Sequence, residues 1–309
     1  MYLGWTQVAF DEEMAGDVGP ADVAGRALVT VRDGGETRVF DGRCPHRGAH
    51  LGWGARLDGG SLICAFHGYR VHLGDRRPRD RGEQPFCVGE HPALASVGGI
   101  FVLLDERLDT KLRERLEQLS RTHIFRPAFT RDVNVPPEYI VENVLDIDHF
   151  TAVHGLKHPP QLTVRETDAG SLRVDGQLDF VRPNIWQGEA ESTGTEGHAR
   201  FSAEVFSPTL VITELGSSDP PHVVITAATP TAAGGSVARV TIGLALQAGS
   251  KPPTVREFSS LVSGSRTAFE QDSVVWEHLD TTVTPHYRGG DSLVQTYRAF
   301  CDRFREDAR

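Results

Sequence analysis

Short apolar runs separated by turn residues fill the first third of the chain, a pattern typical of a β-rich domain. The runs at 27–31 and 37–40 flank an Asp-Gly-Gly turn at 33–35, which predicts a hairpin. At 108–121 the pattern changes to a charged helix, with leucines at helical spacing. We therefore predict two domains, residues 1–107 and 108–309. Further short strands are predicted at 61–65, 69–72 and 100–104.

The second region contains both strand-like and helix-like patterns of apolar residues. This predicts an α+β fold, an antiparallel sheet with helices on one side. A helix is predicted from Pro136 or Pro137, which suit a helix start, to Gly155, which suits a stop. Strand-like segments and then helical segments follow. The strand-like segments are 170–181, 197–215, 221–229 and 236–247, and the helical ones are 254–279 and 292–304.

Composition narrows the class of protein. Among 309 residues, 39% are hydrophobic and 24% charged, as in globular proteins. The net charge of −10 argues against a nucleic-acid partner and leaves open basic docking partners or a plain solvated surface. We see no signal peptide and no apolar run near the ~20 residues of a membrane span. The cytoplasm is the expected compartment, where cysteines are more often thiols or metal ligands than disulfides.

Two short motifs in the first domain carry the strongest chemical signal. They read Cys44-Pro-His46-Arg-Gly and Cys64-Ala-Phe-His67-Gly, each placed just after a predicted strand. Two loops of this kind can close over one small inorganic group. Two thiolates and two imidazoles are the ligand set of a Rieske [2Fe–2S] cluster.

A Cys₂His₂ zinc site is the alternative interpretation of these motifs. Zinc sites favour two to four residues between paired ligands, so the one-residue gap of C-x-H fits zinc poorly. The remaining cysteines, Cys87 and Cys301, stand alone, and ordinary packing is the better interpretation for both.

The two motifs closely resemble the Rieske domains of ring-hydroxylating and related oxygenases, over about residues 5–105. The chain departs from the family at Phe66 and Tyr69, where tyrosine and tryptophan are common. These departures leave the four cluster ligands untouched.

A second motif, N-x-x-D-x-x-H-x-x-x-x-H, lies in the second domain. On a helix, Asn143, Asp146 and His149 would share one face. His154 lies five residues beyond His149, so an undistorted helix would turn it away. Both histidines can reach one ion only if the helix bulges or ends between them, and Gly155 is consistent with an ending.

This spacing resembles the iron-binding segment of the same oxygenases. Two histidines and one carboxylate form the facial triad of non-heme Fe(II), which leaves positions open for O₂. Our candidate for the third ligand is Asp272, because Phe269, Asp272 and Trp276 fall on one apolar helix stripe. A buried carboxylate needs a partner, and the family's third ligand has a similar Asp-x-x-x-Trp context. Asp272 could instead pair with an arginine or cap a loop; the substitutes are Glu270, Glu277 and Asp280.

The resemblance also implies a role for Asp146. In the family, an aspartate here bridges a cluster histidine of one subunit to an iron histidine of its neighbour. Carried over, His67 of one chain would hydrogen-bond Asp146 of the next, and Asp146 would hold His149. Asn143 would support the site, or simply contact water. This arrangement implies a ring-shaped homo-oligomer, by resemblance to the family a trimer.

The resemblance implies a terminal oxygenase with a helix-grip-like catalytic domain. Electrons from NAD(P)H would pass through a separate reductase or ferredoxin to the cluster, then to Fe(II), where O₂ oxidises a small molecule. The length resembles the homotrimeric α-only branch, which includes ketosteroid hydroxylases and demethylating mono-oxygenases. Mono-oxygenation of an apolar compound, polycyclic ones included, is favoured; dioxygenation, demethylation and desaturation stay open. Candidate pocket residues are Phe180, Trp186, Phe201 and Phe206.

Three other classes of protein compete with this interpretation. A Rieske-type electron carrier would lack mononuclear iron, and the set His149, His154 and Asp272 counts against it. A zinc-stabilised interaction protein would contain zinc and no labile sulfide. A binding module with a degenerate iron site would need a triad ligand to be missing, and none is.

Overall fold

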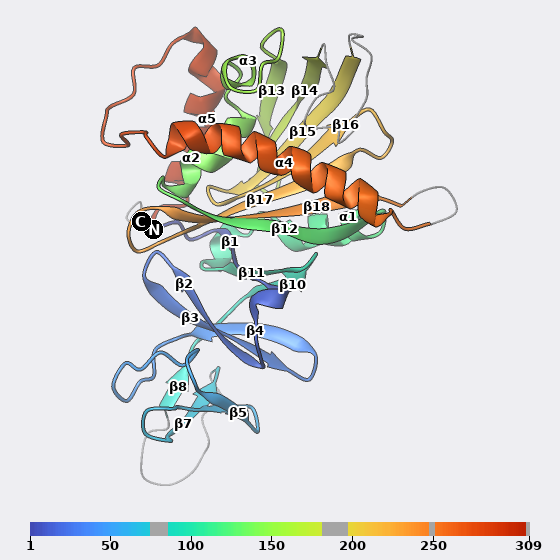
Figure 1. The fold of residues 1–309 in the computed structure, drawn as a ribbon. Coiled ribbons are helices and arrows are strands. Elements are labelled where there is room, and N and C mark those ends of the chain that lie inside the picture. Colours follow the sequence, from blue (N-terminus) through green and yellow to red (C-terminus); the bar gives the residue numbers. More distant parts are fainter. Residues whose placement is uncertain (75–85, 181–196, 247–250, 307–309) are drawn as a thin grey trace.

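The computed structural model describes all residues except 75–85, 181–196, 247–250 and 307–309. Figure 1 shows the β-rich N-terminal region below and a large sheet with helices above it. This is the α+β architecture predicted from the sequence. No helix of the described residues is long and apolar enough to cross a membrane.

The N-terminal region consists of three small sheets. The predicted hairpin is confirmed, because β3 (Arg26–Asp33) and β4 (Glu36–Asp41) pair across Gly34 and Gly35, whose φ angles are +59° and +86°. Positive φ at both turn residues matches the right-handed twist of the strands, and glycine adopts it without strain. The strands predicted at 61–65, 69–72 and 100–104 correspond to β6 (Ser61–Ile63), β7 (Arg70–Leu73) and β11 (Gly99–Leu103).

The three sheets are defined by their strand order along each sheet. The first contains β1 (Trp5–Phe10), β11 (Gly99–Leu103) and β10 (Ala93–Ser96); the second contains β2 (Val18–Val23), β3 (Arg26–Asp33), β4 (Glu36–Asp41) and β9 (Glu90–His91); the third contains β5 (Arg56–Asp58), β6 (Ser61–Ile63), β7 (Arg70–Leu73) and β8 (Phe86–Val88). Short 3₁₀ turns lie at η1 (Asp11–Glu13) and η2 (Glu106–Leu108).

The C-terminal region is built on one seven-stranded antiparallel sheet. Its order, from edge to edge, is β12 (His123–Val133), β18 (Ser236–Ala245), β17 (His222–Pro230), β16 (Leu210–Gly216), β15 (Gly197–Ser207), β14 (Leu172–Phe180) and β13 (Gln161–Glu166). The prediction of one strand at 197–215 was wrong, since the chain turns after Ser207 and continues as β16. The sequence analysis also missed β12 and β13, whose charged and polar residues hide the two-residue period.

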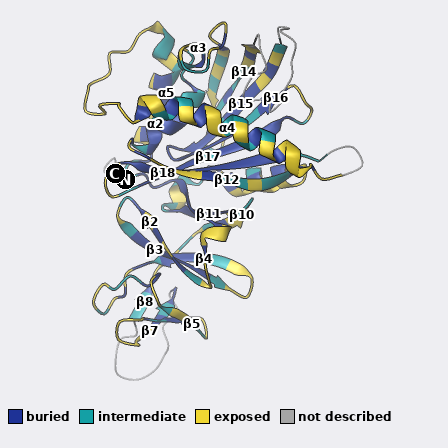
Figure 2. Ribbon diagram, in the orientation of Figure 1, coloured by how far each residue is buried: buried dark blue, intermediate teal, exposed yellow. Residues whose placement is uncertain are grey.

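Helices cover both faces of this sheet. On one face lies α1 (Leu112–Ser120), with the sheet of β1, β10 and β11. The other face carries α4 (Val255–Trp276) and α5 (Ser292–Asp302), preceded by the 3₁₀ turn η5 (Gly289–Asp291). Figure 2 shows α4 buried toward the sheet and exposed along its outer side. The prediction of helices on one side therefore holds for α4 and α5 but not for α1.

The path of the chain explains how distant residues meet on the second face. Strands β12 and β13 lie at opposite edges of the sheet, so residues 134–160 must cross from one edge to the other. After β18, α4 runs along the same face (Figure 1). Two segments more than 100 residues apart are thereby brought together over the sheet.

The two regions share a hydrophobic core, which holds them in one arrangement. Trp5 and Phe101 pack with Phe206 and Leu210 of the large sheet. The carbonyl of Trp5 accepts hydrogen bonds from the hydroxyls of Ser207 and Thr209, at 2.5 and 2.8 Å. The predicted boundary at 107/108 falls in η2, beside this core.

A buried histidine at one end of the large sheet leads to a pH prediction. His222 is 8% exposed, and burial first, then the neighbouring His123, lowers its pKa to about 4. Between about pH 6.5 and 4, His222 is protonated in the unfolded chain but not in the folded chain. The free energy of unfolding therefore decreases as the pH is lowered through this interval. We expect a loss of about 2–3 kcal/mol in the free energy of unfolding between pH 7 and 4.5 from His222.

Urea unfolding at several pH values measures this effect. The variant His222→Gln should lose less stability than the unmodified protein over the same interval. His286→Gln, which replaces an exposed histidine, should follow the unmodified protein. Identical pH dependence of His222→Gln and the unmodified protein would contradict the prediction.

Candidate metal centres

The segment carrying the two histidines is an interrupted helix rather than the single helix predicted over 136–155. It consists of α2 (Pro137–Val141), η3 (Glu142–Val144) and α3 (His149–Ala152). The carboxylate of Asp146 accepts hydrogen bonds from the backbone N–H groups of Asp148 and His149, at 3.2 and 3.3 Å, which starts the new turn. The break resolves the spacing problem, because His149 begins α3 and His154 follows its end.

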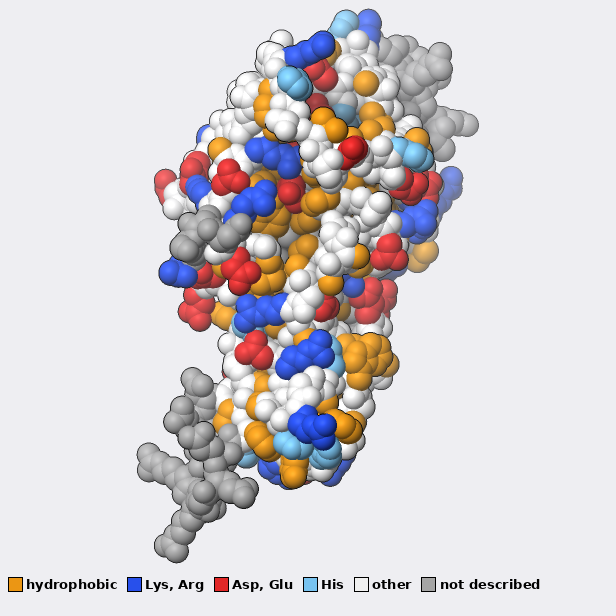
Figure 3. Space-filling model, turned by 90° about the vertical axis from the view of Figure 1, so that its left-hand side faces the viewer, with side chains coloured by type: hydrophobic (Ala, Val, Ile, Leu, Met, Phe, Trp, Pro, Cys, Tyr) orange, Lys and Arg blue, Asp and Glu red, His pale blue; other side chains and the backbone are white. Residues whose placement is uncertain are grey.

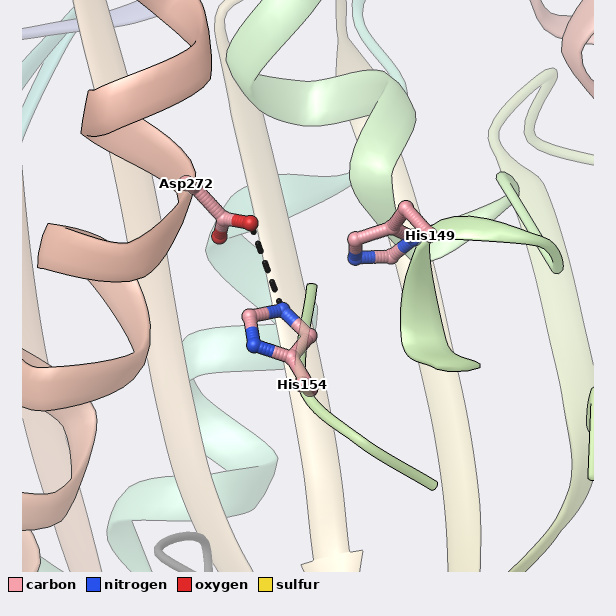
Figure 4. A group of neighbouring side chains, drawn as sticks. All are labelled: His149, His154 and Asp272. Carbon is pink, nitrogen blue, oxygen red and sulfur yellow. Dashed lines mark ion pairs between the residues drawn. The ribbon is translucent and has the colours of Figure 1, made fainter. Parts of the chain in front are cut away.

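The side chains of His149, His154 and Asp272 converge, although Asp272 comes from α4 (Figure 4). One ligand atom from each lies within 4.8 Å of the other two. The shortest contact joins Nε2 of His154 to Oδ1 of Asp272 at 3.3 Å. Two imidazole nitrogens and a carboxylate oxygen at this spacing fit the facial triad of non-heme Fe(II).

The environment of Asp272 follows the predicted pattern. Asp272, Phe269 and Trp276 are all buried on the inner side of α4. The substitute Glu270 points outward, is exposed and pairs with Arg131 at 3.0 Å. The other substitutes, Glu277 and Asp280, are also exposed and lie outside the converging group.

Hydrogen bonds set the orientation of both imidazole rings. Nδ1 of His149 donates to the backbone carbonyl of Asp146 at 2.5 Å, and Nδ1 of His154 donates to Oε1 of Gln271 at 3.0 Å. Because both acceptors are oxygens, Nδ1 is the donor in each ring, which makes Nε2 the atom that would bind a metal. Asp146 thus holds His149 through its carbonyl, whereas the sequence analysis expected its carboxylate to do so.

The protonation of the two rings differs. Burial lowers the pKa of His149. Burial also opposes protonation of His154, but the hydrogen bond and charge of Asp272 outweigh it and raise that pKa overall. Metal binding at His154 would therefore compete with protonation of its ring.

Gln271 was missed by the sequence analysis, although its place beside Asp272 on the chain is a usable signal. Gln271→Leu would remove the acceptor for His154 while keeping a similar volume. We expect Fe(II) affinity to fall about 10- to 100-fold, as for other residues that orient a metal-bound histidine. Competition with a chelator, in iron-free protein, measures this directly.

Gln271→Glu keeps an oxygen acceptor at this position and should retain most of the affinity. Equal affinities in Gln271→Leu and the unmodified protein would show that the hydrogen bond to His154 does not matter for binding iron.

Asn143 lies near the same group and lines a cavity between α4 and the sheet. The cavity and its opening to solvent together contain about 710 Å³ of empty space. Of the predicted pocket residues, Phe201 lines it, whereas Phe206 packs against the opposite face of the sheet. The side chain of Phe180 and all of Trp186 lie outside the described residues.

The first predicted centre lies in two similar loops of the N-terminal region. Cys44 and Cys64 are each 3% exposed, His46 is half-buried and His67 is exposed. The rings of His46 and His67 lie with their centroids 4.7 Å apart. Inner thiols and outer imidazoles, on two loops, fit a [2Fe–2S] cluster with cysteines on one iron and histidines on the other.

The glycine that closes each motif has a structural reason. Gly48 and Gly68 each donate a backbone hydrogen bond to the carbonyl of the motif's cysteine, at 2.8 and 2.9 Å. Their φ angles are +74° and +72°, a region that favours glycine. Both loops therefore make the same tight turn around the ligands.

The zinc alternative would use the same four residues, Cys44, His46, Cys64 and His67. Labile sulfide distinguishes the two kinds of site, because a [2Fe–2S] cluster contains it and a zinc site does not. Cys301 packs in the core as predicted.

Comparisons with known proteins agree with both centres. Residues 4–80 match the family described as "Rieske [2Fe-2S] domain". Residues 110–304, more than half of the chain, match "3-Ketosteroid 9alpha-hydroxylase C-terminal domain". The chain belongs to the Rieske non-heme iron oxygenases.

The names of the relatives of this Rieske oxygenase chain refer to varied compounds. Pheophorbide a oxygenase of Oryza sativa is 26% identical, over 68% of this chain and 41% of that protein. The oxygenase component of chloroacetanilide N-alkylformylase from Rhizorhabdus wittichii is 27% identical, over 59% and 53%. The 4beta-methylsterol monooxygenase of Methylococcus capsulatus is 31% identical, over 48% and 44%. The chain spans about half the length of the curated relatives it matches.

Solved structures show the same fold over almost the whole Rieske oxygenase chain. Dicamba monooxygenase bound to 3,6-dichlorosalicylic acid has a TM-score of 0.73 at 17% identity, covering 97% of this chain and 96% of that one. NdmB of Pseudomonas putida CBB5 has a TM-score of 0.71 at 18% identity, covering 96% and 89%. At this level of identity the similarity establishes the fold.

Proposed function

We propose that this protein is a terminal oxygenase that uses O₂ to hydroxylate or otherwise oxidise an apolar small molecule. The observation that carries the proposal is the convergence of His149, His154 and Asp272 at one cavity. Mono-oxygenation is favoured, with dioxygenation, demethylation and desaturation as the other outcomes of the same iron chemistry.

The roles of the residues follow from their placement. His149, His154 and Asp272 would hold Fe(II) and leave coordination positions facing the cavity. Iron bound there would supply the activation of O₂, with electrons arriving from the [2Fe–2S] cluster. Phe150, Phe269 and the other apolar walls would exclude water and seat the substrate.

The source of electrons follows from the shape of the chain. In Figure 1 the cluster loops lie in the lower sheets, whereas α3 and its histidine lie at the top of the molecule. A cluster so far from the iron of its own chain is poorly placed to supply it. We therefore propose that the cluster of one chain serves the iron of the next, in the ring-shaped trimer that the family resemblance implies.

The surface around the cluster supports such a contact. Phe66 and Tyr69 are 59% and 47% exposed beside the exposed ring of His67, and Trp53 is 69% exposed. Figure 3 shows hydrophobic, histidine and arginine side chains together at this end of the molecule. In the proposed trimer His67 would donate to Asp146 of the neighbouring chain. NAD(P)H would supply the electrons through a separate reductase or ferredoxin, in the cytoplasm.

The second candidate function is electron transfer without oxygenase activity. It would leave the converging triad and its cavity unexplained. The test is the EPR spectrum of anaerobic Fe(II) protein with nitric oxide, which binds where O₂ would and needs no reductase. A high-spin Fe–NO signal, lost in His149→Ala, is expected. Its absence from iron-replete protein would leave an electron carrier.

A further inference from the structure

The cavity beside the triad has a floor and a roof of different origin. The roof is a stripe of α4 that includes Ser265 and Ala268, whose small side chains leave space above the sheet. The floor consists of residues on β15 to β18 that face α4. Those from β16, β17 and β18 are Val211, Thr213, Leu215, Val224, Thr226 and Val240.

Two threonines interrupt this otherwise aliphatic floor. Thr213 pairs with Val224 across β16 and β17, and Val211 pairs with Thr226. Thr213 and Thr226 are therefore diagonal neighbours on one face, with Cβ atoms separated by up to about 7–8 Å. A single small polar group can lie between two hydroxyls at that spacing.

Neither hydroxyl has a partner among the residues that the structure describes. Two other threonines close to this sheet do have partners: Thr209 donates to the carbonyl of Trp5 and Thr229 to that of Gln7, at 2.8 and 2.5 Å. Because polar groups in apolar surroundings are costly without hydrogen bonds, the two cavity hydroxyls are suited to a ligand or to water that a ligand displaces.

The charges around the cavity narrow the ligand further. Among its described lining residues, the ionisable groups are His149, His154 and Asp272. Nearby arginines are engaged elsewhere: Arg131 pairs with Glu270, and Arg266 stacks on the ring of Phe129. An anionic ligand would find no guanidinium or ammonium among these residues, so a neutral ligand is favoured.

We propose that Thr213 and Thr226 form the recognition element of the cavity and select a neutral, largely apolar substrate that carries a hydroxyl or a ketone. A threonine hydroxyl both donates and accepts, so the pair can bind either group. Held there, the oxygen of the substrate would fix which carbon faces the triad. This inference rests on the proposed oxygenase function and assigns the specificity of the same site.

Binding of four matched compounds to the iron-loaded full chain, measured anaerobically by calorimetry, tests the inference. The compounds are fluorene, 9-fluorenol, 9-fluorenone and fluorene-9-carboxylate, which share a three-ring skeleton. We expect 9-fluorenol or 9-fluorenone to bind most tightly and the carboxylate most weakly. Thr213→Val and Thr226→Val should each lower the affinity for the preferred compound about 3- to 10-fold, the range for one neutral hydrogen bond.

Fluorene binding should stay within about twofold in both variants, because valine keeps the shape of threonine. Thr213→Ser, which keeps the hydroxyl, should restore most of the preference. Thr241→Val is the matched control: its hydroxyl is also buried without a partner among the described residues, but it faces the opposite side of the sheet from Val240. This variant should leave all four affinities unchanged.

Three results would overturn the inference. The first is that the carboxylate binds most tightly. The second is that the valine variants weaken the binding of fluorene as much as that of the oxygenated compounds. The third is that none of the four compounds binds. The Fe–NO signal separates these failures from failure of the proposed function. If the signal persists, the iron site stands and only the assigned specificity is wrong.

Discussion

Asp272→Ala should lose its mononuclear iron and all oxygenase turnover while keeping the [2Fe–2S] cluster. Removing the carboxylate leaves two neutral imidazoles, which hold Fe(II) poorly, and it removes the charge that balances the metal. The loss should exceed the about 10- to 100-fold effect of changing a residue behind a ligand. Iron content per chain and the Fe–NO signal of the reconstituted protein measure it.

Matched controls come from the same helix. Glu270→Ala removes an exposed carboxylate that pairs with Arg131, and it should keep both iron and turnover. Because the cluster lies at the other end of the chain, its visible absorption reports that Asp272→Ala still folds. Full iron occupancy in Asp272→Ala, together with loss in Glu270→Ala or Glu277→Ala, would show that the third ligand was assigned to the wrong residue.

Cys64→Ser is expected to have the second large effect, loss of the [2Fe–2S] cluster and of electron delivery. Cys64 is 3% exposed and packs beside Cys44 under the two loops, so no nearby thiol can replace it. Turnover driven by a reductase should fall to background. The Fe–NO signal should persist, because the triad lies in the other domain.

Labile sulfide and the visible spectrum give the readouts for this variant. Cys87→Ser is the control, since Cys87 is half-buried on β8 and belongs to neither motif. A protein that contains zinc and no labile sulfide before mutation would contradict the cluster assignment and revive the zinc alternative. Together the two variants assign each metal to its own domain.

Local patterns predicted part of the N-terminal region: strands β3, β4, β6, β7 and β11 and the two cluster motifs, but not β1, β2, β5 or β8 to β10. The hairpin around Gly34 and Gly35 and the glycines that close the cluster motifs are decided by backbone conformations open to few residues. The cluster ligands also lie within 25 residues of sequence, from Cys44 to His67. Local spacing therefore carried both the structure and the chemistry of this centre.

The large sheet was predicted less well, for an equally physical reason. Strands β12 and β13 lie at its two edges, where half of the side chains face water and charged residues replace the alternating apolar ones. Strands β15 and β16 were merged because both sides of their turn are apolar and buried. When both faces of a strand are buried, apolar and polar residues no longer alternate, so the end of one strand cannot be told from the start of the next.

Some features of the iron centre could be predicted from the sequence, and others depend on the tertiary structure. Local sequence determined that His149 and His154 need a break in the helix, and that Asp272 lies on a buried stripe. Only the tertiary structure decided that these residues meet, because the crossing from β12 to β13 and the return along α4 place both segments on one face. The contact between Gln271 and His154 follows from that arrangement. Local periodicity records which side of an element is buried, but not which distant element covers it.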